Sequence, residues 1–161
     1  MSVAVLLITD GRTEYIGDTI ASFNAHVSGP ITERWMYDDS GDPEHREWLR
    51  ELAPSFRQIY HPDGRQGFGG AISYAWEELD ANTKASHIFH LEDDFTFNFR
   101  PRLGALCRVL DADPFLAQMA LRRQPWNAAE KAAGGVVEAN PDAFVERSSW
   151  FGEWLEHNAF W

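Results

Sequence analysis

Three adjacent carboxylates, Glu92, Asp93 and Asp94, come directly after the mostly apolar residues 88–91. Carboxylate oxygens are ligands that Mg²⁺ and Mn²⁺ prefer, and such an ion usually takes only one or two of them, with water and substrate phosphates completing its coordination. The triplet therefore predicts a divalent-cation site, and a solvated acidic turn is the alternative interpretation.

A second acidic pair, Asp38 and Asp39, follows the apolar residues 35–37. A carboxylate in this position could accept a hydrogen bond from a base nitrogen or from ribose hydroxyls. The alternative is that the pair forms a turn or caps the helix expected after Pro43. Because this pair also ends an expected strand, we predict that it lies near the acidic triplet.

The glycine cluster at residues 67–70 precedes an expected helix, whose N-terminus would favour a phosphate. Its spacing is not the dinucleotide-binding fingerprint, and tight packing of the helix on the sheet is an equal alternative. Arg65, just before the cluster, offers a planar set of donors for a base carbonyl or a phosphate; otherwise it is an ordinary surface arginine.

Other chemistries lack support in the residue spacing. His87 and His90 are three residues apart on an expected strand, so they face opposite sides, and no cysteine nearby completes a zinc site. Cys107 is the only cysteine, which excludes an internal disulfide. Neither Cys107 nor the serines at 148 and 149 have neighbours that indicate a nucleophile.

The elements that must position these residues alternate between strands and helices. The expected strands are residues 3–8, 31–37, 56–60, 86–91 and 115–121, and the expected helices are residues 18–27, 44–52, 71–79 and 101–110. The Ala- and Gly-rich residues 127–143 predict a surface loop. Alternation of this kind predicts an α/β fold with a mostly parallel sheet flanked by helices. The acidic strand ends would then converge on one crevice at the carboxyl edge.

Composition limits the classes of partner. The chain of 161 residues carries 25 acidic and 14 Lys or Arg residues, for a net charge of -11, with 44% hydrophobic content. We expect one compact, soluble, cytoplasmic domain with no membrane span and no secretory signal. The excess of acid argues against general binding to nucleic acid or anionic lipid. The oligomeric state stays open.

Taken in chain order, four motifs resemble the nucleotide-sugar-binding half of GT-A-fold glycosyltransferases, especially family 2. These motifs are the first strand ending at Thr9, the sequence Tyr-Asp-Asp-Ser at 37–40, Arg65 with its glycine cluster, and the acidic triplet. The resemblance covers roughly residues 3 to 127. It implies a Rossmann-like GT-A fold in a single domain, 1–161, with the nucleotide-sugar-binding part in about residues 1–127 and a loop plus an incomplete acceptor-side segment in 128–161.

The resemblance also implies roles for individual residues. Uracil would be held by Thr9 and Asp39, the base would meet Arg65, the backbone at Gly69 would approach the donor, and the metal would bind Asp94. The triplet reads Glu-Asp-Asp, similar to a variant of the Asp-x-Asp motif in some N-acetylglucosaminyltransferases. Its first-position glutamate leaves open whether Glu92 or Asp93 meets the ribose.

An inverting member of that family uses a later carboxylate, often within a Glu-Asp motif, to deprotonate the acceptor hydroxyl. No Glu-Asp pair follows residue 93, so the candidates are Glu146, Glu153 and Glu156. Glu153 has the most aromatic surroundings, and a surface glutamate on an amphipathic helix is the alternative.

These observations lead to the expectation of a metal-dependent glycosyltransferase, with Mn²⁺ or Mg²⁺ as its cofactor. It would move a sugar from a nucleotide donor, such as a UDP-sugar, to an acceptor hydroxyl with inversion. One alternative is a sugar nucleotidyltransferase, although residues 9–13 are too short and too weakly basic for its phosphate loop. The other is a non-catalytic nucleotide- or metal-binding module without an acceptor half.

Overall fold

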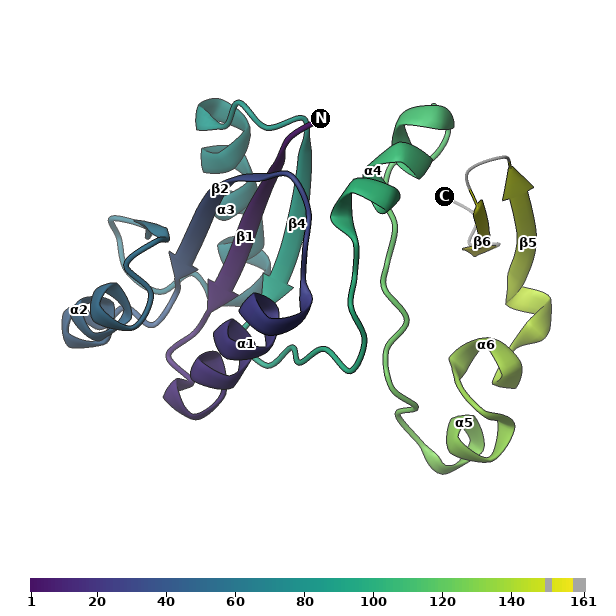
Figure 1. Cartoon of the computed structure of the whole chain (residues 1–161). Coiled ribbons are helices and arrows are strands. Elements are labelled where there is room, and N and C mark those ends of the chain that lie inside the picture. The colour runs from purple at the N-terminus through teal and green to yellow at the C-terminus, as the bar shows by residue number, and fades with distance from the viewer. Residues whose placement is uncertain (150–151, 158–161) are drawn as a thin grey trace. The chain divides into compact units, whose positions relative to one another are not determined.

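The central strand of the sheet is β1 (Val3–Thr9), an almost wholly apolar segment. All of its residues are buried, as expected for an inner strand of a parallel sheet that is covered on both faces. It pairs in parallel with β2 (Ile31–Asp38) on one side and with β4 (His87–Glu92) on the other, and β2 pairs in parallel with β3 (Arg57–Ile59). The strand order in this computed structural model is β3-β2-β1-β4, and Figure 1 labels the last three of these strands. The predicted α/β fold with a parallel sheet is confirmed.

The structure describes residues 1–149 and 152–157; within these, the side chains of residues 149, 152–154, 156 and 157 are not described. The chain divides into two compact units, residues 1–107 and residues 108–161. The parallel sheet and every predicted donor- and metal-binding residue belong to the first unit.

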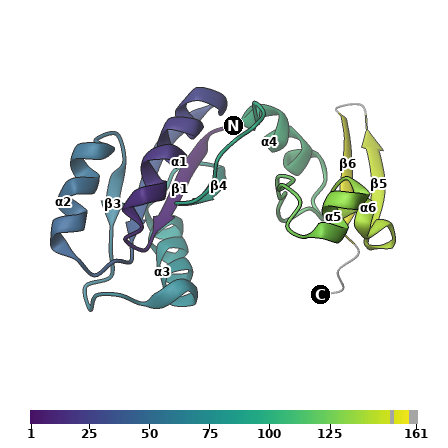
Figure 2. The same cartoon turned by 90° about the horizontal axis from the view of Figure 1, so that it is seen from below.

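Helices cover both faces of the sheet. The helices α1 (Thr13–His26) and α2 (Pro43–Leu52) share a buried cluster with alternate residues of β1, and α3 (Gly67–Asn82) packs on the other face. Figure 2 shows α1 and α3 on opposite sides of β1. The first core includes Val5, Leu7, Ile16, Phe23 and Leu49. The second includes Leu6, Tyr37, Ala71, Ala75 and Leu79. This layering leaves the carboxyl ends of the strands free to carry loops.

Helix starts are set by particular acceptors. Asp42 accepts a hydrogen bond from the Glu44 amide, and Pro43 occupies the first turn of α2, so α2 begins as predicted. α3 begins at Gly67 rather than at residue 71, because the Asp39 carboxylate accepts from the backbone amides at 66 and 67. The glycine cluster is thus the first turn of α3 and not a loop before it. α1 likewise begins at Thr13, ahead of the predicted residue 18.

The later part of the chain departs most from prediction. α4 (Leu103–Ala112) corresponds to the helix expected over 101–110. Residues 115–121 form no strand, since they pair with no strand that the structure describes. The Leu116 amide instead donates to the nearby Asp113 carbonyl. The loop predicted over 127–143 instead contains the short helices α5 (Ala128–Ala133) and α6 (Val136–Ala139) and the 3₁₀ turn η1 (Pro141–Ala143).

Two features account for these elements of the second unit. The Asn127 side chain accepts from the Glu130 amide and caps the alanine-rich α5, whose composition favours helix. β5 (Phe144–Ser149) and β6 (Gly152–His157) follow as an antiparallel pair.

Candidate functional site

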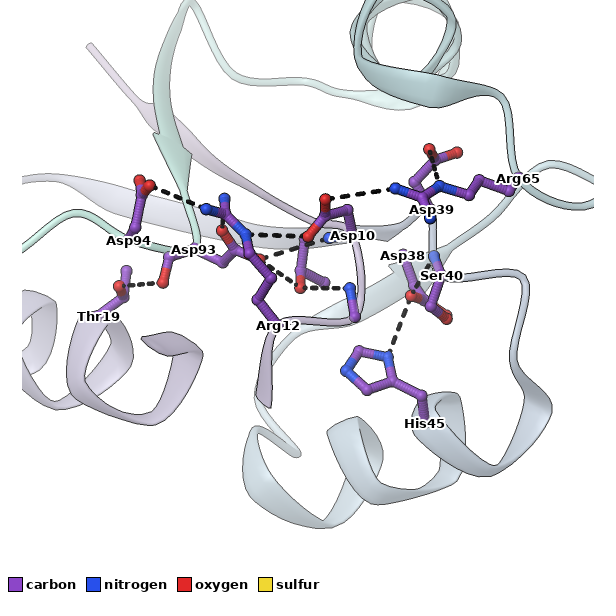
Figure 3. A network of polar contacts seen from close by, with 12 residues as sticks. Asp10, Arg12, Thr19, Asp38, Asp39, Ser40, His45, Arg65, Asp93 and Asp94 are labelled. Atoms are coloured by element: carbon purple, nitrogen blue, oxygen red, sulfur yellow. Dashed lines mark hydrogen bonds and ion pairs between the residues drawn. The ribbon is translucent and has the colours of Figure 1, made fainter. Parts of the chain in front are cut away.

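The carboxyl edge of the sheet has a point where the strand order reverses. From β1 the chain passes to β2 on one side, and it later returns to place β4 on the other side of β1. In open α/β sheets, ligands bind outside the carboxyl ends of the strands at such a point. The loops after β1, β2 and β4 meet here, and their polar side chains form one network (Figure 3).

Asp93 is the buried centre of this network. Its carboxylate accepts from Thr9 Oγ1 at 2.8 Å and from the Asp10 amide at 3.4 Å, and its backbone carbonyl accepts from Thr19 Oγ1 at 2.6 Å. Burial raises the pKa of Asp93, while the bond from Thr9 and the charge of Arg12 act in the opposite direction. Asp93 therefore joins β4 to both β1 and α1.

Arg12 lies among three carboxylates. Its Nε donates to Asp10 at 3.0 Å, its Nη1 donates to Asp94 at 3.1 Å, and its Nη2 donates to Asp93. The side chain is 40% exposed. Burial lowers the pKa of Arg12, but the charges of Asp93, Asp94 and Asp10 outweigh this effect and the pKa is raised. The guanidinium thus balances negative charge at the acidic edge.

Glu92 and Asp94 flank the buried Asp93 and differ from it in exposure. The Asp94 side chain is 42% exposed, and Glu92 is partly buried. Burial raises the pKa of Glu92, and the neighbouring charges of Asp94 and Asp93 raise it further. The Glu92 carboxylate makes no hydrogen bond within the described part of the chain. Both carboxylates can reach a ligand at the edge.

Asp39 and Arg65 form the other side of the network. The Asp39 carboxylate accepts from the Gln66 amide at 2.7 Å and the Gly67 amide at 2.8 Å, so it caps α3 rather than the helix after Pro43. Arg65, which is 59% exposed, lies 3.5 Å from Asp10 and 3.9 Å from Asp39. Asp10 pairs with both Arg65 and Arg12, and this shared partner connects the two sides.

A hollow of about 420 Å³ opens beside the network, between the loop after β1 and the start of α2. The buried Asp38 accepts from the Ser40 amide, His45 Nδ1 and Arg46 Nε at 3.0 to 3.2 Å. His45 lines the hollow, and its buried Nε2 has no hydrogen-bond partner among the described residues. These contacts fix the β2–α2 connection, with Asp38 as their common acceptor.

The residues present match a hard divalent cation in ligand chemistry. Among the side chains that the structure describes, no group of three or more His, Cys, Asp or Glu is arranged to hold a metal ion. Mg²⁺ and Mn²⁺ commonly take only one or two carboxylates and complete their coordination with water and substrate phosphates. The exposed Asp94 can supply such oxygens, and so can Glu92, whose carboxylate has no hydrogen-bond partner among the described residues. Arg12 competes for Asp94.

The predicted site residues divide into an inner and an outer set. Thr9, Asp39 and Asp93 are at most 2% exposed, and their side chains make internal hydrogen bonds. The outer set comprises Arg65, Glu92 and Asp94, together with Gly69, where an added Cβ would meet no atom within 4 Å. Glu153 lies in β6 of the second unit, and its side chain is outside the described residues.

Arg12 is the main residue of the network that the sequence interpretation missed. Its signal was the charge itself: it is a basic residue just beyond the end of β1, in a chain that places acids after β1, β2 and β4. The glycine before it has φ +100°, a conformation that favours glycine and turns the loop there.

A search of protein-family models finds no family that matches the chain, and a comparison with curated proteins finds no match of significance. In the described part of the chain, the helices are all too short or too polar to span a bilayer.

Proposed function

We propose that the chain binds a nucleotide-sugar donor, a UDP-sugar, at the carboxyl edge of its sheet and transfers the sugar to an acceptor hydroxyl. The observation that carries this proposal is the junction of Thr9 and Asp93 at the reversal of strand order. It brings an exposed carboxylate, Asp94, and two exposed arginines, Arg12 and Arg65, into one network.

The arginines are the groups suited to the nucleotide. Arg65 lies 3.5 Å from Asp10 and 3.9 Å from Asp39, and its side chain is 59% exposed, so it can donate to a base carbonyl or a phosphate. Asp39 has a positioning role in this proposal. Its carboxylate holds the first turn of α3 through two backbone amides and lies 3.9 Å from Arg65. The exposed surface at Gly69 lets a ligand approach that turn closely.

Asp94 and Glu92 are the residues that would hold Mn²⁺ or Mg²⁺. A bound divalent cation would supply Lewis-acid stabilisation of the charge that develops on the leaving diphosphate. Asp93 does not take part directly; it anchors the loop that presents its two neighbours. The buried bond from Thr9 thereby orients the acidic triplet.

The proposal also includes a catalytic base for the acceptor hydroxyl. Transfer with inversion needs a carboxylate that removes the proton from the acceptor hydroxyl. Glu153 is our candidate for this base on the aromatic character of residues 150–154.

The experiment is a calorimetric titration of UDP into the full chain, with and without Mn²⁺. With Mn²⁺ present, we expect Asp94→Ala to weaken UDP binding by at least about tenfold, or about 1.4 kcal/mol. Without Mn²⁺, the variant and the unmodified chain should differ much less, because the contact through Asp94 depends on the cation.

Asp80→Ala is the matched control, since it removes an exposed carboxylate from the far end of α3. It should leave UDP binding unchanged. UDP affinity that is the same with and without Mn²⁺, and indifferent to Asp94→Ala, would contradict the role of the metal. UDP binding without release of UDP from any UDP-sugar in a panel would favour the non-catalytic alternative.

A further inference from the structure

Arg12 engages the acidic edge with all three of its guanidinium nitrogens. Each nitrogen donates to a different carboxylate: Nε to Asp10, Nη1 to Asp94 and Nη2 to Asp93. A planar guanidinium can make such a divided set of bonds, whereas an ammonium acts as a single point charge. The side chain therefore joins the loop after β1 to the loop after β4.

Each of these carboxylates keeps another hydrogen-bond partner, another ion pair or contact with solvent when Arg12 leaves. Asp93 keeps its bonds from Thr9 and from the Asp10 amide. Asp10 keeps Arg65 at 3.5 Å, and Asp94 has water, since its side chain is 42% exposed. Departure of the guanidinium leaves no carboxylate both buried and without a partner, so the contact is exchangeable.

A divalent cation on Asp94 would compete with this arrangement. Arg12 Nη1 lies 3.1 Å from the Asp94 oxygen that it contacts, and a cation bound to the same oxygen would repel the guanidinium at short range. An incoming diphosphate supplies the opposite charge and fits the donor geometry of arginine. The cation and the diphosphate thus both favour movement of Arg12 away from Asp94.

We propose that Arg12 is an internal counter-ion that holds Asp93 and Asp94 in the ligand-free chain and transfers to the diphosphate of the donor when Asp94 takes the divalent cation. This inference rests on the proposed function, because it uses the same cation and the same donor. It assigns to Arg12 a positioning role before binding and a phosphate contact after it. It also makes binding of the cation and of the nucleotide cooperative.

The first test measures Mn²⁺ alone, from the loss of the free-ion electron paramagnetic resonance signal, on the full chain. We expect Arg12→Gln to bind Mn²⁺ at least about tenfold more tightly than the unmodified chain, because the competing charge is gone. The same variant should bind UDP with Mn²⁺ more weakly, since the diphosphate loses a donor. Arg12→Lys keeps the charge and should stay closer to the unmodified chain in Mn²⁺ affinity.

Arg50→Gln is the matched control, because Arg50 is an exposed arginine on α2 that pairs only with Glu47 in the described part of the chain. It should change Mn²⁺ affinity less than about twofold, as expected for a screened surface charge. Equal Mn²⁺ affinity in Arg12→Gln and the unmodified chain overturns the role of Arg12 and leaves the metal role standing. No Mn²⁺ uptake by either protein, with or without UDP, overturns both.

A second measurement uses the unmodified chain, so it does not depend on whether a variant folds. The Arg12 Nε–H donates to Asp10 and should give a distinct nitrogen–proton NMR signal. Addition of UDP with diamagnetic Mg²⁺ should shift that signal, whereas Mg²⁺-free UDP should shift it less. A signal that stays in place at saturating UDP and Mg²⁺ overturns the proposal.

Discussion

Asp93 shows how a buried carboxylate is tolerated at the edge of this sheet. Its side chain is 0% exposed, which is costly for a charged group unless hydrogen bonds and opposite charge compensate. Thr9, the Asp10 amide and Arg12 supply that compensation. These partners come from the end of β1 and the loop after it. Asp93, in the loop after β4, therefore fixes the end of β4 beside the end of β1.

Thr9→Val tests this anchor. Valine keeps the shape of threonine and removes the hydroxyl that donates to Asp93 at 2.8 Å, so a buried acceptor loses a partner. We expect the free energy of unfolding to fall by about 1–3 kcal/mol. Urea denaturation measures this quantity. Thr32→Val, the same change at an exposed position of β2, should alter it by less than about 0.5 kcal/mol. Equal effects of the two variants would show that the Thr9–Asp93 bond contributes little.

Residue types after strands were enough to predict which acids gather, but not what each one contacts. Asp39 is an example: its amide partners lie 27 and 28 residues later, at the start of α3, and local sequence cannot reveal such a contact. Arg12 is another, because the direction of its side chain depends on the turn at Gly11 and on acids more than 80 residues away. The donor- and metal-binding roles themselves stay predictions.

At the scale of elements, prediction worked where burial sets the pattern. β1 is apolar on both faces because α1 and α2 pack on one side and α3 on the other, and its pattern is visible in the sequence. Prediction failed over residues 115–121, a mostly apolar segment that has no partner strand in the described structure. A strand depends on its neighbours, while a helix such as α5 satisfies its own backbone.

Glu33 at the start of β2 gives a prediction about acid stability. Its carboxylate accepts from the Lys84 amide, Trp35 Nε1 and Thr83 Oγ1, each at 2.9 Å, and so ties β2 to the segment before β4. The bond from the Lys84 amide is the largest cause that lowers the pKa of Glu33 below its ordinary 4.5, and burial opposes it.

A lowered pKa means that the unfolded chain binds the proton more readily than the folded one. The stability that Glu33 contributes is therefore present above pH 4.5 and is lost as the pH falls through the lower folded-state pKa. Glu33→Gln should melt at a lower temperature than the unmodified chain at about pH 7, and the difference should shrink toward about pH 3. Thermal unfolding across this range measures it, with Glu51→Gln on the exposed side of α2 as control. A difference independent of pH would show that the charge of Glu33 is not involved.

For the whole molecule, the division at residue 107 separates the donor network from the later elements. The three buried clusters draw their residues from 3–107, and so do Arg12, Arg65 and the acidic triplet. A fragment of residues 1–112, which ends with α4, therefore contains the complete sheet and every residue of the proposed donor site.

We expect this fragment to unfold in a single cooperative transition and to bind UDP with Mn²⁺ within about threefold of the full chain. Chemical denaturation and calorimetry check the two parts. Sugar transfer should be lost in the fragment, because our candidate base Glu153 is removed with residues 113–161. A fragment that folds but binds UDP far more weakly would show that the second unit contributes to the donor site.

The pairing of β1 with β4 also bears on how the chain folds. β1 and β2 can pair as soon as residue 38 has been made, but the other edge of β1 waits for residues 87–92. Thr9 and Asp93 are 84 positions apart, and contacts between such distant residues form slowly because a long loop must close first. During synthesis we expect the edge of β1 to stay open until β4 docks, and docking should assemble the charge network in the same step. Completion of the sheet and the appearance of the site are one event.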